Sequence, residues 1–238
     1  MSRIAEDLVD ESPPNLPPVV RFEGVRLVAG DGGPITFSIN QGGLYVMVGP
    51  SGSGKTTALD LIGLSGRRAQ GRIDLFGRDV SRLKSREVPL LRRRVGRIFQ
   101  DLRLDDDLNA FDNVALAIRA TGAKTEDNRH HIAEVLAWLG LTDQMGVRPK
   151  RLSSYECRRL AIARAVINRP TLIIADEPAG DLEGKAAAAI LRLLVDLHAV
   201  GTTVLIASRR DGLPQSAGAT VLPLTPPSAN VPNAGNWS

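Results

Sequence analysis

The stretch GPSGSGKTT, Gly49 to Thr57, decides the fold. It follows the apolar run LYVMV, which is typical of a buried strand, and it opens the run TTALDLIGL, which predicts a helix. Gly52 and Gly54 allow backbone amides to turn toward one point, and the amino end of the helix adds positive potential there. A strand, a glycine-rich turn and a helix in this order predict a loop that binds polyphosphate.

The side chains of this loop have distinct expected roles. Lys55 is expected to reach the β- and γ-phosphates of a nucleotide, and the hydroxyl of Thr56 to coordinate Mg²⁺. A glycine-rich turn with an incidental lysine is the alternative, and the flanking strand and helix make it the weaker one. The other residues expected to hold the phosphates are Gly49, Ser51, Gly52, Ser53, Gly54 and Thr57.

A second signal is TLIIADEP, Thr171 to Pro178, in which an apolar run delivers two acids to the carboxyl end of a buried strand. Ligands of open α/β sheets bind at this edge. Asp176 suits a place near Mg²⁺, and Glu177 is placed to orient or deprotonate an attacking water. The alternative, two acids at an ordinary strand end, is weakened by the phosphate loop. Together the two stretches predict binding of MgATP.

Outward from these stretches, the pattern is that of an α/β protein. VVRFEGVRLV and ITFSIN predict short strands near the amino end, and RRVGRIF, TLIIAD and TTVLIAS predict buried parallel strands. Residues 104–170 contain no convincing strand and read as a helical insertion. We therefore expect a P-loop (RecA-like) fold with a mostly parallel sheet, an antiparallel β edge at the amino end and a helical insertion.

The length of 238 residues favours one domain. Prolines precede the first strand, and PLTPPSANVPNAGNWS ends the chain without apolar periodicity, so both ends are expected to be disordered. The expected boundaries are a tail at 1–18, a folded domain at 19–223 and a tail at 224–238.

Composition narrows the setting of the protein. The single cysteine, Cys157, fits a reducing compartment, and no apolar run is long enough to span a bilayer. Eight basic residues lie from Arg82 to Arg103. Such a charge run favours a solvated helix face over a patch that binds phosphate or lipid headgroups. No nucleic-acid recognition module accompanies them, so no nucleic-acid partner is expected. We therefore expect a cytoplasmic protein that acts at a membrane only through a partner.

Four motifs occur in the order typical of the ATP-binding-cassette (ABC) family: GPSGSGKTT, IFQD with Gln100, LSSYE before RRLAIARAVINRP, and LIIADEPAGDLE. The chain resembles this family over nearly all of its folded part. Within the family, LKSREVPLLRRRVGRIFQDLRL and FDNVALAIRATG are similar to the FtsE group, the ATP-binding subunits of bacterial FtsEX cell-division complexes.

The resemblance implies an ABC nucleotide-binding domain with ATPase activity, whose helical insertion is of the ABC type. It implies ATP and Mg²⁺ as ligands, Gln100 as a residue of both the catalytic and the metal site, and Ser153 as a donor to a γ-phosphate. It also implies an ATP-dependent homodimer in which each LSSYE segment covers the nucleotide of the other copy. The implied partner is an FtsX-like integral membrane protein that docks near Gln100 and the insertion and holds the chain at the inner face of the plasma membrane.

The chain departs from the family pattern at four places. Ser154 and Tyr155 replace two glycines of the signature segment, so close approach to phosphate is in doubt, and replacing both with glycine should raise ATPase activity. Arg209 stands where a switch histidine is expected, and we assign it a catalytic role through contact with phosphate. Position 28 or 29 lacks the aromatic residue that stacks on adenine. Asp181 and Glu183 alter the segment after LIIADEP more mildly.

Two hypotheses of different classes remain. Because Lys55, Thr56, Gln100, Asp176 and Glu177 are all present, the first is a slow ATPase that drives a membrane partner. The second is a nucleotide-binding scaffold with negligible hydrolysis. An ATPase subunit of another ABC transporter, and a heterodimer with an intact cassette, stay open as further alternatives.

Overall fold

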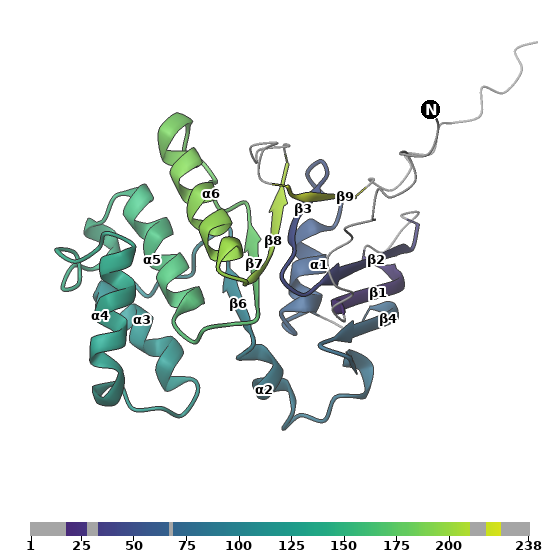
Figure 1. The fold of residues 1–238 in the computed structure, drawn as a ribbon, viewed down its shortest axis with the longest axis horizontal. Helices are drawn as coiled ribbons and strands as arrows, with labels where there is room; N and C mark the ends of the chain where they lie inside the picture. The colour runs from purple at the N-terminus through teal and green to yellow at the C-terminus, as the bar shows by residue number, and fades with distance from the viewer. Residues whose placement is uncertain (1–17, 28–32, 67–68, 210–217, 225–238) are drawn as a thin grey trace, which may run out of the picture.

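The computed structural model describes residues 18–27, 33–66, 69–209 and 218–224. Two sheets and a group of helices make up the fold (Figure 1). The antiparallel sheet has the order β2-β1-β4-β5, and the parallel sheet has the order β6-β7-β8-β3-β9. The predicted α/β fold with a parallel sheet, an antiparallel edge and a helical insertion is confirmed.

The antiparallel sheet covers one side of the molecule near the amino end. Its strands are β1 (Pro18–Arg26), β2 (Ile35–Asn40), β4 (Gln70–Leu75) and β5 (Arg78–Asp79). Phe22 and Phe37 face each other across β1 and β2 with ring centroids 4.6 Å apart. This stacked pair fixes the register of the two strands, because aromatic cross-strand pairs are favourable contacts in a sheet.

The parallel sheet is built from apolar runs because both of its faces are covered. Its strands are β3 (Leu44–Val48), β6 (Val95–Ile98), β7 (Leu172–Asp176), β8 (Thr203–Ser208) and β9 (Thr220–Pro223). Along β7, Leu172 and Ile174 pack into one core with helix α1 (Lys55–Ile62), whereas Ile173 and Ala175 pack into the other core with helix α6 (Gly184–Ala199). Successive side chains of the strand point to opposite faces of the sheet, so one strand contributes residues to both cores.

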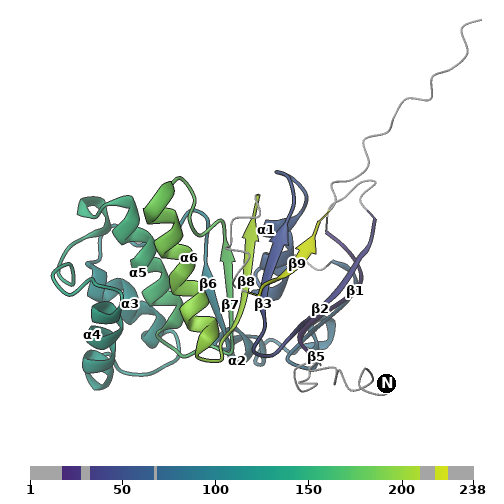
Figure 2. The same ribbon diagram turned by 45° about the horizontal axis from the view of Figure 1, so that its top comes forward.

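The helical insertion stands beside the β6 edge, away from the antiparallel sheet (Figures 1 and 2). It contains α3 (Ala110–Arg119), α4 (Arg129–Trp138) and α5 (Ser154–Val166), with the short turns η2 (Glu126–Asn128) and η3 (Pro149–Arg151). No strand occurs between residues 104 and 170, all of which are described. The fully buried Asn113 holds the loop before α3 in place, because its side chain forms hydrogen bonds with the backbone of Asp105, Leu108 and Asn109. We refer to this insertion as the helical arm.

The basic cluster spans the turn η1 (Val80–Arg82), helix α2 (Val88–Arg92), strand β6 and the loops around them. Several side chains of the cluster contact other protein groups, although the sequence predicts that they face solvent. Arg97 pairs with Asp60 of α1, and the Arg94 guanidinium lies 3.8 Å from the centroid of the Phe76 ring. The prediction of a solvated face therefore holds for exposed members such as Arg93 and is wrong for Arg97.

The described residues include one position beyond the expected range 19–223 at each end. Pro18 is the first residue of β1. Leu224 is buried, and its amide donates to the carbonyl of Val48 at 2.7 Å. Both residues therefore belong to the domain, and the rest of the two predicted tails lies outside the described residues.

Within the part of the chain that the structure describes, none of the helices combines the length and the apolar character that crossing a membrane requires.

Candidate nucleotide-binding site

The loop from Gly49 to Gly54 joins β3 to α1 and presents its backbone as a cradle. Gly52 and Gly54 have φ angles of +81° and +95°, which side chains rarely tolerate. A Cβ added at Gly52 would meet no atom within 4 Å, so open space lies over the loop there. Gly54 is the N-cap of α1 and no side chain caps this end. The first amides of α1 are therefore available to an anion.

Lys55 is the buried cation of the loop. Only 7% of the residue is exposed, and Nζ donates to the carbonyl oxygens of Gly49 at 2.6 Å and Pro50 at 2.9 Å. Both contacts are to carbonyls, and no carboxylate lies within ion-pair distance of the ammonium in the described part of the chain. The positive charge is therefore available to phosphate oxygens.

Ser53 and Gly49 form the floor of the loop. The hydroxyl of Ser53 is buried and has no hydrogen-bond partner. A Cβ at Gly49 would stand 2.5 Å from that hydroxyl and 2.6 Å from the carbonyl oxygen of Leu224, the residue after β9. The floor is thus closed to side chains, and it holds one polar atom whose bond a ligand or water could complete.

Asp176 ends β7 beside this loop and is 3% exposed. Burial raises the pKa of its carboxyl group above the usual range. The hydroxyl of Thr56 and the charges of Arg97 and Lys55 lower the pKa again, but their effect is smaller. A buried carboxylate beside a threonine hydroxyl is a donor set that suits Mg²⁺.

Glu177, the next residue, is held in an unusual backbone conformation. Its φ angle is +44°, and its amide donates to the carbonyl of Ala207 on β8 at 2.9 Å. A positive φ at a residue other than glycine costs energy, and such strain is common at functional sites. The conformation turns the side chain toward β8, where Oε1 lies 3.3 Å from Nε of Arg209.

These residues line one cavity of about 300 Å³ at the carboxyl edge of the parallel sheet. The cavity brings together most of the site residues predicted from the sequence. Gly49 and Ser53 lie beneath it and Ser153 lies elsewhere, at the start of α5. The lining residues are Ser51, Gly52, Gly54, Lys55, Thr56, Thr57, Gln100, Asp176, Glu177 and Arg209.

Ser153 is the N-cap of α5 and forms a capping box with Glu156. Its hydroxyl donates to Oε2 of Glu156 at 2.7 Å and accepts from the Glu156 amide at 3.3 Å. The Ser153 amide, which donates to Oε2 of Glu156 at 2.8 Å, and then the Ser153 hydroxyl lower the pKa of the Glu156 carboxyl group. The hydroxyl that the sequence suggests as a phosphate donor is therefore already engaged within its own helix end.

Tyr155 turns back against the helical arm instead of projecting from the helix end. The ring is half-buried and packs on the core, and the Arg159 guanidinium lies 5.0 Å from its centroid. Ser154 is exposed at the amino end of α5. Of the two residues that replace glycine, only Tyr155 thus has a structural role.

Sequence reasoning missed Arg158, which ties α5 to the loop after β7. Its guanidinium is 8% exposed and bonds Oδ1 of Asp181 at 2.5 Å and the carbonyl of Pro178 at 3.3 Å. Any Cβ at Gly180 would collide with this guanidinium, at 1.9 Å from Nη2. Arg158 holds the pKa of Asp181 below its usual range through this hydrogen bond. No local pattern in the sequence marks this long-range pair.

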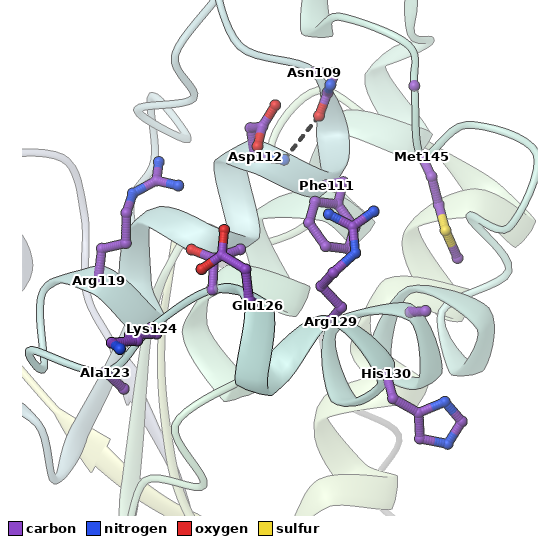
Figure 3. A pocket seen from close by; sticks show the side chains of 13 residues that line it. Asn109, Phe111, Asp112, Arg119, Ala123, Lys124, Glu126, Arg129, His130 and Met145 are labelled. Carbon is purple, nitrogen blue, oxygen red and sulfur yellow. Dashed lines mark hydrogen bonds between the residues drawn. The ribbon is translucent and has the colours of Figure 1, made fainter.

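Two further cavities lie in the described part of the fold, one next to the site and one in the helical arm. One of about 560 Å³ lies under the loop from Pro178 to Glu183, and Glu177 and Arg209 form part of its wall as well. Another, of about 900 Å³, lies in the helical arm between the ends of α3 and the start of α4 (Figure 3). The expected adenine position, 28 or 29, lies outside the described residues.

The arm pocket combines apolar surface with cations. Phe111 and Met145 supply the apolar part, and the Arg129 guanidinium lies 5.2 Å from the Phe111 ring centroid (Figure 3). Arg119, Lys124 and Arg129 have no carboxylate within ion-pair distance among residues 69–209 or the other described segments. Acidic side chains also line it, namely Asp112 and Glu126.

The comparisons with known proteins agree with this geometry. The family model described as ABC transporter matches residues 33–180. The cell division ATP-binding protein FtsE of Escherichia coli (strain K12) is 42% identical over 174 residues, which are 73% of this chain and 78% of that protein. FtsE of Mycobacterium tuberculosis (strain ATCC 25618 / H37Rv) is 38% identical over 174 residues, 73% of this chain and 76% of that one.

Two solved structures extend the likeness to the fold. The dimeric structure of MJ0796, a bacterial ABC transporter cassette, gives a TM-score of 0.75 at 27% identity and covers 87% of this chain and 94% of that one. A post-hydrolysis state of the same cassette, dimeric and bound to ADP and Pi, gives a TM-score of 0.71 at 30% identity, with 80% and 88% covered.

Proposed function

This chain belongs to the ABC transporter family, and we propose that it is the ATP-binding subunit of an FtsEX-like cell-division complex. In this role it binds MgATP, hydrolyses it slowly to ADP and phosphate, and uses the cycle to change the conformation of a membrane partner. The observation that carries the proposal is the single cavity in which Lys55, Thr56, Asp176 and Glu177 meet.

Each side chain of the cavity has a proposed part in the reaction. The loop amides and Lys55 hold the phosphates, and Thr56, Asp176 and Gln100 hold Mg²⁺. When bound, the metal offsets the negative charge on the phosphate oxygens. Glu177 orients the attacking water and accepts its proton. Arg209 lies where it contacts the terminal phosphate.

An ATP-dependent homodimer completes the proposed site. Ser153 does not line the cavity of its own chain, so it reaches a nucleotide only on a second copy. The similar cassette MJ0796 is dimeric. For Ser153 to act as a donor there, its hydroxyl must leave Glu156, and this exchange is part of the proposed closure.

The proposed partner is an FtsX-like integral membrane protein, as for the FtsE proteins that the chain resembles. The arm pocket is its proposed docking place, because an acidic cytoplasmic segment with an apolar residue complements Arg119, Lys124, Arg129 and the Phe111 surface. Such docking would hold the chain at the cytoplasmic face of the plasma membrane.

One observation favours the scaffold as a second candidate. In the structure Glu177 is engaged by Arg209 and Ser153 by Glu156, so both groups are occupied before any nucleotide is bound. A scaffold would keep these contacts with ATP bound, whereas an ATPase would exchange them.

The test of the proposed function is MgATP binding and phosphate release by the wild type and Lys55→Ala. Loss of a charged hydrogen-bond donor should weaken ATP binding by about 10- to 100-fold. The matched control is Lys84→Ala, which removes an exposed lysine. Thermal melting of each variant verifies folding. Equal ATP affinity in all three proteins would contradict the proposal. If the wild type binds ATP tightly but releases no more phosphate than Lys55→Ala, the nucleotide-binding scaffold is the function that remains.

A further inference from the structure

Glu177 and Arg209 face each other at the carboxyl edge of the parallel sheet. Glu177 directly follows β7 and Arg209 directly follows β8, and these strands pair in parallel with Asp176 opposite Ala207. The amide of Glu177 donates to the carbonyl of Ala207, which fixes the start of its side chain two residues from Arg209. The 3.3 Å contact between Oε1 and Nε thus follows from the strand register.

The carboxylate of Glu177 depends on this one cation. Its side chain is 13% exposed, and Oε1 is buried without a partner at hydrogen-bond geometry. No other cation lies within ion-pair distance of it in the described segments. A buried charge without its partner is costly, so the pair is favoured as long as nothing else claims either group.

Arg209 differs from Glu177 in its access to ligands. Its side chain is 59% exposed and lines the cavity that also holds Lys55 and Thr56. A guanidinium binds phosphate oxygens at two points, and a triphosphate carries more charge than one carboxylate. A terminal phosphate in the cavity therefore competes with Glu177 for Arg209.

We propose that Arg209 is an autoinhibitory residue: its guanidinium holds Glu177 in an ion pair until the terminal phosphate of ATP draws the guanidinium away. This inference rests on the proposed function and concerns its regulation. While the pair is closed, the guanidinium faces Oε1, the oxygen that an attacking water would otherwise meet. The pair is also shared by the walls of the 300 Å³ and 560 Å³ cavities, so its opening changes both.

The Arg209–Glu177 ion pair, which we call the lock, predicts a difference between the binding of ATP and the binding of ADP. ADP has no terminal phosphate to claim Arg209, so it leaves the pair closed. ATP binding must break the pair, and part of its binding free energy is used for this. Removing the acid by Glu177→Gln should therefore tighten ATP binding by about two- to fivefold, the range typical of a partly exposed ion pair, and leave ADP binding unchanged.

The experiment is a double-mutant cycle of Glu177→Gln and Arg209→Gln with ATP and ADP affinities measured by calorimetry. In the Arg209→Gln background, Glu177→Gln should no longer tighten ATP binding, since no pair is left to break. At saturating ATP the pair is already open in the wild type, so the proposal predicts no rise in kcat for Arg209→Gln, and its effect is confined to the ATP and ADP affinities. A control variant, Arg192→Gln, removes an exposed ion pair with Asp196 on α6 and should change none of these values.

Arg209→Lys serves as the second variant, because it keeps the charge without the planar guanidinium. In this background, the tightening of ATP binding by Glu177→Gln should fall between its values in the wild type and in Arg209→Gln. Tightening of ATP binding by Glu177→Gln that persists in the Arg209→Gln background, or equal tightening of ATP and ADP by Glu177→Gln, overturns the lock and leaves the proposed function intact. Failure of the wild type to bind MgATP overturns both.

Discussion

Asp176 and Glu177 are neighbours in the chain, yet the fold gives their carboxyl groups different surroundings. Asp176 lies at the buried end of β7, where burial raises its pKa. Glu177 turns away through its positive φ and meets Arg209. Two adjacent acids in different surroundings suit the different roles proposed for them, Asp176 in holding the metal and Glu177 in orienting the attacking water.

The raised pKa of Asp176 predicts a pH-dependent cost. The folded state binds the carboxyl proton more tightly than the unfolded chain does, so this residue costs no stability below the unfolded pKa. As pH rises from the unfolded pKa through the raised folded pKa, the buried carboxylate costs stability, and the full cost is present above the folded pKa. Asp176→Asn should therefore raise Tm at pH 7 by about 2–4 °C, which corresponds to about 1 kcal/mol in a domain of this size.

Scanning calorimetry of the nucleotide-free protein at several pH values is the measurement. The difference between variant and wild type should shrink as pH falls. Asp143→Asn at an exposed position is the control and should show no such gain. A lower Tm for Asp176→Asn at neutral pH would show that the carboxylate is stabilised by its neighbours and that burial is the smaller effect.

At the scale of elements, α5 links the two functional ends of the domain. Its first turn holds Ser153 and Tyr155, and one turn further Arg158 grips the loop after β7 through Asp181. Because Arg158 is buried against Gly180, that loop and α5 are coupled in position. A shift of α5 during closure would therefore also shift the loop next to Glu177.

The double replacement Ser154→Gly with Tyr155→Gly tests the amino end of α5. Removing both side chains should let the helix amides approach a phosphate of the second copy more closely and raise kcat, by less than the hundredfold that one oxyanion donor can supply. Ser154→Gly alone is measured beside it, and because Ser154 is exposed at the helix end while Tyr155 turns back on the arm, it should give most of the gain. The measurement is ATPase activity with the membrane partner present.

The structure adds a cost to this replacement. Tyr155 packs on the core of the helical arm and under Arg159, and glycine in a helix is unfavourable by about 1 kcal/mol per residue. Tm should therefore fall in the double variant. A folded double variant with unchanged or lower activity would mean that Ser154 and Tyr155 are working contacts and no obstacle.

Much of the fold follows from the sequence because its signals are local. The buried strands β3, β7 and β8 are apolar runs, and the phosphate loop combines glycines with a lysine at fixed spacing. The strands β4, β5 and β9 escaped prediction. β5 and β9 are short strands at sheet edges, and β9 has four residues, three of them largely solvated, and ends in a proline. Arg158 with Asp181 and Arg209 with Glu177 escaped because each pair joins distant residues, and only the strand and helix packing brings them together.

At the scale of the whole molecule, the cavity at the sheet edge and the arm pocket lie on different parts of the fold. The cavity is built on β3, β6, β7 and β8, and the arm pocket on α3 and α4. Helix α5 packs against α3, α4 and β6 and thus connects the two regions. This arrangement suits a protein that carries a change at a nucleotide to a partner.

The proposed docking place predicts an effect of charge. Lys124→Glu with Arg129→Glu should reduce co-purification with the co-expressed FtsX-like protein of the same genome, because the change replaces attraction by repulsion for an acidic segment. Binding of MgATP by the isolated chain should stay unchanged. The matched control is Arg26→Glu with Arg93→Glu, two exposed arginines outside the arm. Equal loss in both double variants, or in neither, would contradict docking in the arm pocket.

The closed floor beneath the phosphate loop has a consequence for directed evolution of this protein. A side chain at position 49 would collide with the Ser53 hydroxyl and with the backbone of Leu224. Shortening Ser53 would remove only the first collision, and the second involves a backbone oxygen whose position is fixed by the pairing of β9 with β3. No single compensating substitution exists, so a library randomised at positions 49 and 53 together should return glycine at 49 in every folded member.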